Sequence, residues 1–109
     1  MHSHDYQTLV EAQTDLRARG FTVEFSFKDG KLAGDNGQSY AASQLTSLED
    51  YRFEGMTNPG DESILVALRA HDGARGYAIS AYGPYADQAF MEFLAAIPEE
   101  QDTEVESHP

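Results

Sequence analysis

The chain has 109 residues, no cysteine, and 19 Asp and Glu residues against 7 Lys and Arg, giving a formal net charge of -12. This length fits one domain with a single hydrophobic core. The negative charge is poorly suited to nucleic acid or an anionic membrane surface, and the missing cysteine excludes disulfides, thiolate metal ligands and cysteine nucleophiles. With no run of about 20 apolar residues and no signal-peptide pattern, we expect a soluble, cytoplasmic protein that contacts no membrane.

The acidic residues are concentrated at the C-terminal end. The segment 98–109 holds five acids and no Lys or Arg. We therefore expect a single α+β domain over residues 1–97, followed by an acidic disordered tail over residues 98–109. The only lysines are Lys28 and Lys31. An acid-rich, lysine-poor surface is one way to stay soluble at high salt, so one hypothesis is adaptation to a salt-rich cytoplasm. The alternative is an ordinary acidic protein.

The N-terminal half predicts a helix followed by a strand. Thr8 and Glu11 match a capping box that opens a helix over residues 8–19, and Gly20 is placed to end it. Residues 21–28 alternate between apolar and polar side chains, which is typical of a strand with one buried face. The segment 31–47 is less regular, and the turn residues within it leave room for a short edge strand on either side.

The C-terminal half predicts three strands and a second helix. Residues 51–56 alternate, the nearly continuous apolar run 63–70 indicates a central strand, and residues 76–82 return as its hairpin partner. Apolar side chains then recur at helical spacing from Asp87 to Ile97. The predicted fold is α+β, an antiparallel sheet of four to five strands with both helices packed on one face.

Alternation divides the strand residues between two faces of this sheet. The face expected to meet the helices carries Phe21, Val23, Phe25, Phe27, Tyr51, Phe53, Ile64, Val66, Leu68, Tyr77 and Ile79. The opposite face combines an apolar centre with a charged surround, and its candidate ligand or interface residues are Arg52, Glu54, Leu65, Arg69 and Tyr82. Three interpretations stay open: a solvated face, a homodimer interface, or a shallow ligand site that uses Arg52 and Tyr82.

No pattern in the chain predicts catalytic chemistry. Phosphate-binding glycine loops and a serine nucleophile elbow are missing, and the paired acids do not form a matched dyad. The four histidines lie near the termini or in a turn, so we expect no metal site and no cofactor. One junction could hold a small anionic ligand: the start of the second helix, with Tyr85 and Arg52 as donors. The alternative is a bend at Gly83-Pro84 followed by Asp87 as an ordinary helix cap.

Two sequence blocks carry a resemblance to a known family. The stretches Tyr51 to Pro59 and Ala81 to Asp87 resemble the YRFEGMT(N/D)P and AYGxYAD blocks of a family of small uncharacterised bacterial proteins. Members of that family are often labelled phosphoribosylpyrophosphate synthetase. Enzymes of that name are longer and bind ribose phosphate through a loop just after a strand. The nearest acid pair here, Asp61-Glu62, precedes a strand, so the resemblance implies a grouping and not this activity.

Two functional hypotheses follow from the sequence. The first is a non-enzymatic homo-oligomeric or protein-contact module that uses the second sheet face. The alternative is a protein that binds a small ligand, a phosphorylated sugar or nucleotide, through Arg52, Tyr82 and Tyr85. An enzyme ranks below both hypotheses, because the chain supplies neither an activated nucleophile nor a matched acid and base.

Overall fold

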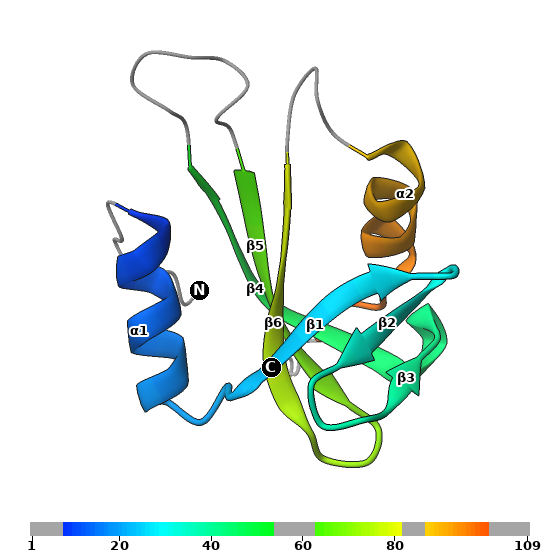
Figure 1. The fold of residues 1–109 in the computed structure, drawn as a ribbon, viewed down its shortest axis with the longest axis horizontal. Helices are drawn as coiled ribbons and strands as arrows, with labels where there is room; N and C mark the ends of the chain where they lie inside the picture. The colour runs from blue at the N-terminus through cyan, green and yellow to red at the C-terminus, as the bar shows by residue number, and fades with distance from the viewer. Residues whose placement is uncertain (1–7, 54–62, 82–86, 101–109) are drawn as a thin grey trace, which may run out of the picture.

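The computed structural model describes residues 8–53, 63–81 and 87–100. The elements within these residues are α1 (Leu9–Ala18), β1 (Val23–Lys28), β2 (Lys31–Gly34), β3 (Ser39–Tyr40), the 3-10 helix η1 (Ala42–Gln44), β4 (Leu45–Phe53), β5 (Ser63–Ala70), β6 (Arg75–Ala81) and α2 (Gln88–Ala96). Figure 1 shows their arrangement. Three of the candidate site residues that the sequence predicts, Glu54, Tyr82 and Tyr85, lie outside the described residues.

The six strands form one mixed sheet in the order β3-β2-β1-β6-β5-β4. The α+β class is confirmed, but the expectation of an antiparallel sheet of four to five strands is wrong. Two antiparallel three-stranded units, β1-β2-β3 and β4-β5-β6, are joined by a parallel pairing of β1 with β6. Alternation within each strand could not predict this joint, because it depends on which distant strands become neighbours.

The two helices lie on opposite faces of the sheet, so the prediction that both cover one face is also wrong. Figure 1 shows β4, β5 and β6 between α1 and α2. Phe90 and Ile97 from the α2 region are buried together with Val66 of β5. Leu16 of α1 is buried together with Leu65, the neighbouring β5 residue. Since successive strand residues point to opposite faces, β5 is covered on both sides.

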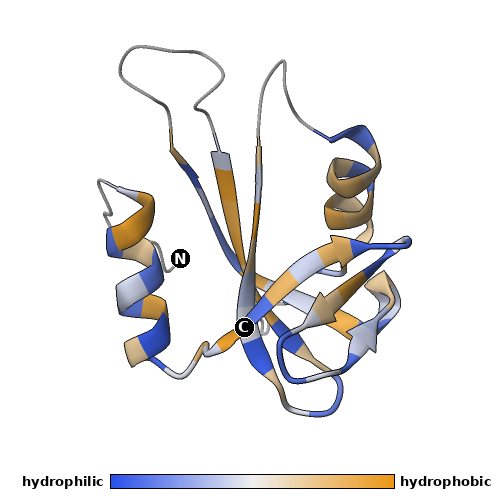
Figure 2. Cartoon of the chain, viewed as in Figure 1, coloured by the Kyte–Doolittle hydropathy of each residue, from blue (hydrophilic) through white to orange (hydrophobic). Residues whose placement is uncertain are grey.

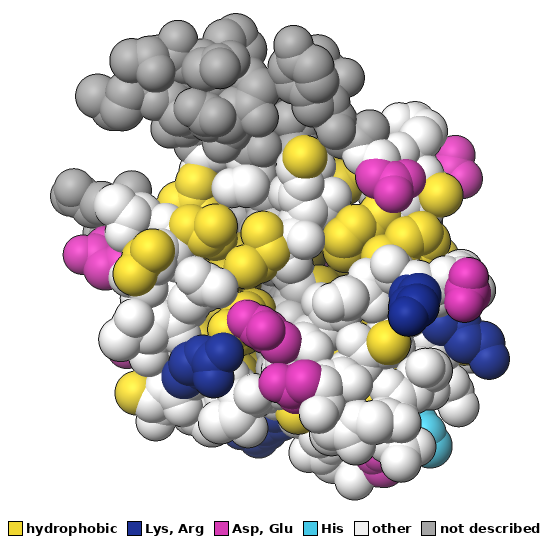
Figure 3. Space-filling view, viewed as in Figure 1, with side chains coloured by type: hydrophobic (Ala, Val, Ile, Leu, Met, Phe, Trp, Pro, Cys, Tyr) yellow, Lys and Arg dark blue, Asp and Glu magenta, His cyan; other side chains and the backbone are white. Residues whose placement is uncertain are grey.

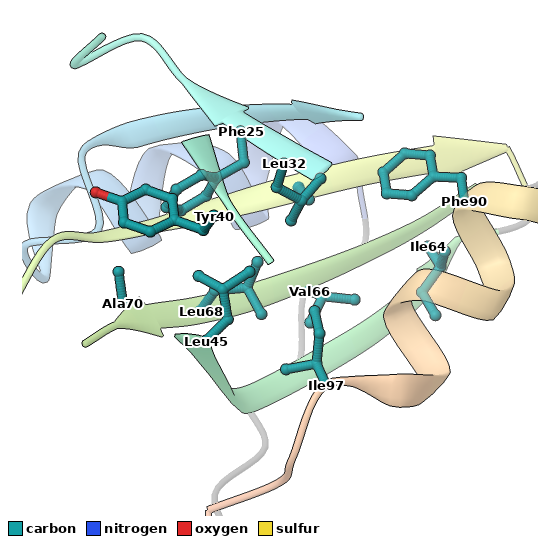
Figure 4. Close-up of a cluster of buried hydrophobic side chains, with 11 residues drawn as sticks. Phe25, Leu32, Tyr40, Leu45, Ile64, Val66, Leu68, Ala70, Phe90 and Ile97 are labelled. Atoms are coloured by element: carbon teal, nitrogen blue, oxygen red, sulfur yellow. The ribbon is translucent and has the colours of Figure 1, made fainter. Parts of the chain in front are cut away.

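Each face has its own buried cluster. The α2-side core consists of Phe25, Leu32, Tyr40, Leu45, Ile64, Val66, Leu68, Ala70, Ala78, Phe90 and Ile97. The α1-side core consists of Ala12, Leu16, Phe21, Leu65, Ala67 and Tyr77. Figure 4 shows the α2-side core, where Phe25, Leu32 and Tyr40 point from one half of the curled sheet toward the other half.

The face assignment of β4 and β6 differs from the prediction by one residue. Tyr51 and Ile79 both pair with Leu65 of β5, so they lie on the α1 side. The alternation pattern had grouped them with Ile64 and Val66, which lie on the α2 side. A shift of one residue exchanges the two faces of a strand, and β5 gave no guidance because both of its faces are apolar.

Local signals at the helix ends are confirmed. The hydroxyl of Thr8 accepts a hydrogen bond from the Glu11 amide at 3.1 Å. At the other end of α1, Gly20 has φ of 100°, and the Phe21 amide donates to the Leu16 carbonyl at 2.9 Å, as in a Schellman cap. The Asp87 carboxylate caps α2 by accepting from the backbone amides of the second and third helical residues.

The joint between β1 and β6 requires a residue without a side chain. Gly76 pairs with Val23, and a Cβ at position 76 would lie 1.8 Å from the Val23 carbonyl oxygen. Such contact is sterically forbidden, so only glycine allows the two strands to come this close. Gly76 therefore permits the connection between the two halves of the sheet.

The segment after α2 continues into the fold. The Ser47 amide donates to the Pro98 carbonyl at 2.8 Å, and the Glu100 amide donates to the Ser47 carbonyl at 3.0 Å. Residues 98–100, which the sequence assigned to the acidic tail, therefore lie against β4. The remaining tail residues, 101–109, lie outside the described part of the chain.

The irregular segment between β1 and β5 contains more strand than the sequence predicts. Short strands are present on both sides of the turn at residues 34–37, as β2 and β3. Only β3 is an edge strand, because β2 lies between β3 and β1. β4 begins at Leu45 instead of Tyr51, and its register shifts between Ser47 and Glu49. This bulge interrupts the alternation that would have revealed the first half of β4.

Candidate functional site

The structure disperses the residues that the sequence had grouped on one sheet face. Arg52 lies exposed on β4, and Leu65 is fully buried, with 0% of its surface exposed. Arg69 of β5 lies 3.5 Å from the Glu100 carboxylate, an exposed pair of the kind that contributes little stability. Leu65 therefore has a role in packing and presents no surface to a partner or a ligand.

The α1 side of the sheet retains an incompletely covered apolar margin. We call the half-buried residues packed around the α1-side core the apolar rim: Leu9, Leu48, Tyr51, Phe53 and Ile79. Val10, the next residue of α1, is 68% exposed. Hydrophobic side chains gather in two patches in Figure 3, one beside α1 and one beside α2. Apolar surface of this kind favours contact with another molecule.

β4 is the last strand of the sheet, and its second half carries charged side chains. Asp50 and Arg52 are exposed, while Tyr51 and Phe53 between and beyond them are half-buried. On the α2 side, a groove of about 170 Å³ separates β4 from α2, and Asp50 lines it. Residues 98–100 cover the outer edge of β4 at Ser47. The part of this edge that lies next to both the apolar rim and the groove is therefore the second half of β4, from Glu49 to Phe53.

Glu49 connects β4 to α1 through two partners. Its carboxylate receives a two-point contact from the Arg19 guanidinium, with one N···O distance of 3.1 Å, and the Tyr51 hydroxyl donates to it at 2.5 Å. The Glu49 side chain is only 13% exposed. Paired contacts between a guanidinium and a carboxylate are strong and directional, so this contact fixes the position of α1 relative to β4.

A second polar contact anchors α1 on the neighbouring strands. The Arg17 guanidinium donates to the Tyr77 hydroxyl at 3.1 Å and lies 3.5 Å from the Glu24 carboxylate. It also lies 5.6 Å from the centre of the Tyr77 ring. Tyr77 in turn donates to Glu24 at 3.4 Å. This network joins α1 to β6 and β1, so its charges serve to hold the fold.

A cleft of about 310 Å³ opens where β1 and β6 separate beyond their paired residues. Its walls are formed by Glu24, Phe25, Ser26, Phe27, Tyr77, Ile79, Asp87 and Phe90. The Phe27 and Phe90 rings are stacked with their centres 5.0 Å apart. The ionised groups among these residues are two carboxylates and no Lys or Arg, so an anion is disfavoured. Arg52, proposed as an anion donor, does not line this cleft.

A polar cluster lies at the other end of the α2-side core. The buried Tyr40 donates its hydroxyl to Asp72 at 2.8 Å and accepts from the Asn36 amide at 3.3 Å. Burial raises the pKa of Tyr40. Hydrogen bonds from the Ala74 amide and the Tyr40 hydroxyl lower the pKa of Asp72. The cluster therefore joins β3 to the turn between β5 and β6.

The described residues contain no group of three or more His, Asp or Glu side chains that could hold a metal ion. No helix in the same part of the chain is long and apolar enough to cross a membrane. Comparison of the chain with protein-family models, curated proteins and solved structures found no match. The resemblance carried by the two sequence blocks therefore stays a prediction.

Sequence reasoning missed Glu49, Arg19, Arg17 and Glu24. Their partners lie far apart in the chain, on α1, β1, β4 and β6, and a single sequence does not reveal such pairs. The cleft was missed for the same reason, because it exists only where β1 and β6 diverge. The sequence did predict one residue of the cleft wall in another role. Asp87 was expected as the N-cap of α2, and its carboxylate also lines the cleft.

Proposed function

We propose that this chain is a non-enzymatic contact module that forms a homodimer through the β4 side of its sheet. The observation that carries the proposal is the composition of that side. An edge strand with exposed charges, Asp50 and Arg52, lies next to the half-buried apolar side chains of Tyr51 and Phe53. Dimer interfaces combine an apolar centre and a charged rim in this way, and edge strands present backbone groups that another strand can bind.

The use of the other charged groups supports this proposal. Glu49, Arg19, Arg17 and Glu24 are engaged in holding α1 against the sheet. These groups therefore have a structural task. Only Glu24 among them also lines the cleft between β1 and β6, so the four groups do not meet in one pocket as catalytic acids and bases do. The charges that remain exposed on β4 are arranged along an edge, which suits recognition of another strand.

The test is the mass of the full chain in solution as a function of concentration. We expect sedimentation equilibrium or native mass spectrometry to show a dimer that dissociates on dilution. Replacing Phe53 of the apolar rim by Asp should shift the equilibrium toward monomer, whereas Lys28→Asp on β1 should leave it unchanged. A protein that stays monomeric at the highest accessible concentration would contradict the proposal.

A second candidate function is supported by the cleft between β1, β6 and α2. Stacked aromatic rings beside the carboxylates of Glu24 and Asp87 favour a small ligand with a cationic or hydrogen-bond-donating group. A thermal-shift comparison of small organic amines with sugar phosphates tests this chemistry. A ligand at 100 times its dissociation constant stabilises the protein by about 2.7 kcal/mol. Stabilisation by the phosphates alone would contradict the cationic assignment.

A further inference from the structure

We infer that two copies of this chain pair their β4 strands antiparallel about a two-fold axis through Tyr51. This inference rests on the proposed dimer and names both the partner and the register of the contact. It is carried by the order of residues in the second half of β4, Glu49-Asp50-Tyr51-Arg52-Phe53.

The strand geometry restricts where the axis can lie. Pairing between β4 and β5 is regular from Glu49 to Phe53, because the register shift lies before Glu49. Along such a strand, successive residues direct their backbone N–H and C=O groups alternately toward β5 and toward the outer edge. In an antiparallel pair, a residue whose groups point toward the partner strand faces a partner residue whose groups point back toward it. A two-fold axis must therefore lie between one residue and the copy of that same residue, and this is what an axis through a residue means here. It cannot lie level with the bond between two successive residues.

Charge selects one of the three central positions. An axis through Asp50 would place this carboxylate opposite its own copy, and an axis through Arg52 would do the same with two guanidinium groups. An axis through Tyr51 instead places Asp50 opposite the partner's Arg52, and by symmetry this ion pair occurs twice. Opposite charges across a strand pair stabilise it, and like charges destabilise it. Of these three registers, only the Tyr51 register places opposite charges next to one another.

The two faces of the paired strands would then have different characters. Asp50 and Arg52 share one face, and Asp50 lines the groove on the α2 side. Glu49, Tyr51 and Phe53 share the other face. Tyr51 and Phe53 belong there to the apolar rim, and Glu49 is bound by Arg19 of its own chain. Tyr51 would meet its own copy at the axis, which extends the apolar rim from one subunit into the other. This arrangement gives the dimer ion pairs on one side and apolar contact on the other.

The chain's own residues 98–100 cover the outer edge of β4 at Ser47. A second copy fits the rest of this edge, from Glu49 to Phe53, better than the segment that follows residue 100 does. The segment 101–109 contains three acids and no Lys or Arg. Placed along β4, these acids would meet Glu49 and Asp50, which are also negative. Arg52 already takes part in an interaction within its own chain. In the dimer, the partner's Asp50 adds to this interaction or replaces it.

Charge exchange tests the register directly. Asp50→Arg and Arg52→Asp each place like charges opposite one another in a homodimer, and both positions are exposed, so folding should be retained. We expect each variant alone to dimerise about tenfold or more weakly than the unmodified chain. An equimolar mixture of the two variants should form heterodimers, because every pair then has opposite charges. The double variant carrying both exchanges should form homodimers again.

Cross-linking provides an independent measurement. The chain has no cysteine, so a single introduced thiol can react only with its own copy. Residues directly opposite one another at an axis have Cβ atoms about 4.5–5.5 Å apart, close to disulfide geometry. Under mild oxidation, Tyr51→Cys should therefore form a covalent dimer. Thr46→Cys, on the same strand but far from the axis, should remain uncrosslinked.

The possible results separate the two proposals. An unmodified chain that is always monomeric overturns the dimer and the register together. A stable dimer that is insensitive to Asp50→Arg and Arg52→Asp overturns the register alone and leaves the contact function standing. Failure of the variant mixture to form heterodimers, or equal cross-linking at positions 46 and 51, also overturns the register. The register is supported if the mixture of Asp50→Arg and Arg52→Asp forms dimers again and if cross-linking is selective for position 51.

Discussion

α1 and α2 cover opposite faces of one sheet, but different forces attach them to it. α2 contributes Phe90, which is buried and stacked on Phe27, together with further apolar side chains along the same helix. α1 buries the smaller side chains of Ala12 and Leu16, and two arginines at its C-terminal end, Arg17 and the cap residue Arg19, bind carboxylates on the sheet. Figure 2 shows this difference in hydropathy, with α2 mainly hydrophobic and α1 alternating between hydrophobic and hydrophilic residues.

The difference shows that the attachment of the two helices to one sheet can respond differently to the same change in solution conditions. Apolar burial scales with area and is not screened by salt. Interactions between partly exposed charges weaken as ionic strength rises, over a Debye length of about 10 Å at 0.1 M. We therefore expect the attachment of α1, but not that of α2, to depend on salt.

The largest effect is expected from Phe90→Ala on α2. Removing a buried aromatic ring that stacks on Phe27 should lower the free energy of unfolding by about 3–5 kcal/mol. The loss should be equal at low and high salt, and urea denaturation at both conditions measures it. Glu92→Ala, an exposed position on the same helix, should change stability by about 0.5 kcal/mol or less. A strongly salt-dependent loss in Phe90→Ala would contradict the comparison.

A smaller effect is expected from Glu49→Gln, which removes the charge that binds Arg19. Hydrogen bonds to charged groups contribute about 1.5–3 kcal/mol, so the variant should lose stability within or just below this range. The loss should shrink in high salt because screening already weakens the ion pair. The matched control is Asp15→Asn, which lies 3.8 Å from the same Arg19 in a more exposed position. If both variants behave alike, Glu49 is not the main anchor of α1.

The smallest effect is expected from Tyr40→Phe, at the polar end of the α2-side core. The pKa of Asp72 is lowered in the folded state, by hydrogen bonds from the Ala74 amide and the Tyr40 hydroxyl. A lowered carboxylate pKa stabilises the fold above the group's ordinary pKa, and this contribution disappears as the pH falls through the lowered value. Tyr40→Phe should therefore differ from the unmodified chain more at neutral pH than in acid.

Urea denaturation at a series of pH values measures this dependence. Asp72→Asn is the control, because it removes the titrating group and should flatten the acid side of the curve further than Tyr40→Phe does. An equal difference between Tyr40→Phe and the unmodified chain at every pH would show that the hydroxyl does not act through Asp72.

The elements that the sequence predicted well are those determined by neighbouring residues. Thr8, Gly20 and Asp87 each act within one helical turn, and each was found in the expected cap. The order of strands depends on distant pairings, which no local pattern encodes. The run Ser63–Ala70 did indicate a central strand. Both faces of this strand are apolar because α1 covers one face of the sheet and α2 covers the other.

The candidate contact surface was only partly predictable. Arg52 was identified because it is a charge on an alternating strand, and it lies on the exposed β4 edge. Leu65 was assigned to an open face because α1 was expected on the other side of the sheet, and the structure buries Leu65 beneath that helix. Asp50 was missed because the predicted strand began one residue later, at Tyr51.

The glycine at the joint between β1 and β6 has a consequence for the order of folding. Each three-stranded unit is built from pairings between strands that follow closely in the chain, which form fast. The β1–β6 pairing, in contrast, must bring Val23 and Gly76 together from opposite ends of the domain. Closing so long a segment costs entropy before any contact forms. The joint should therefore form last, and the two halves can become one sheet only because Gly76 leaves room for the Val23 carbonyl.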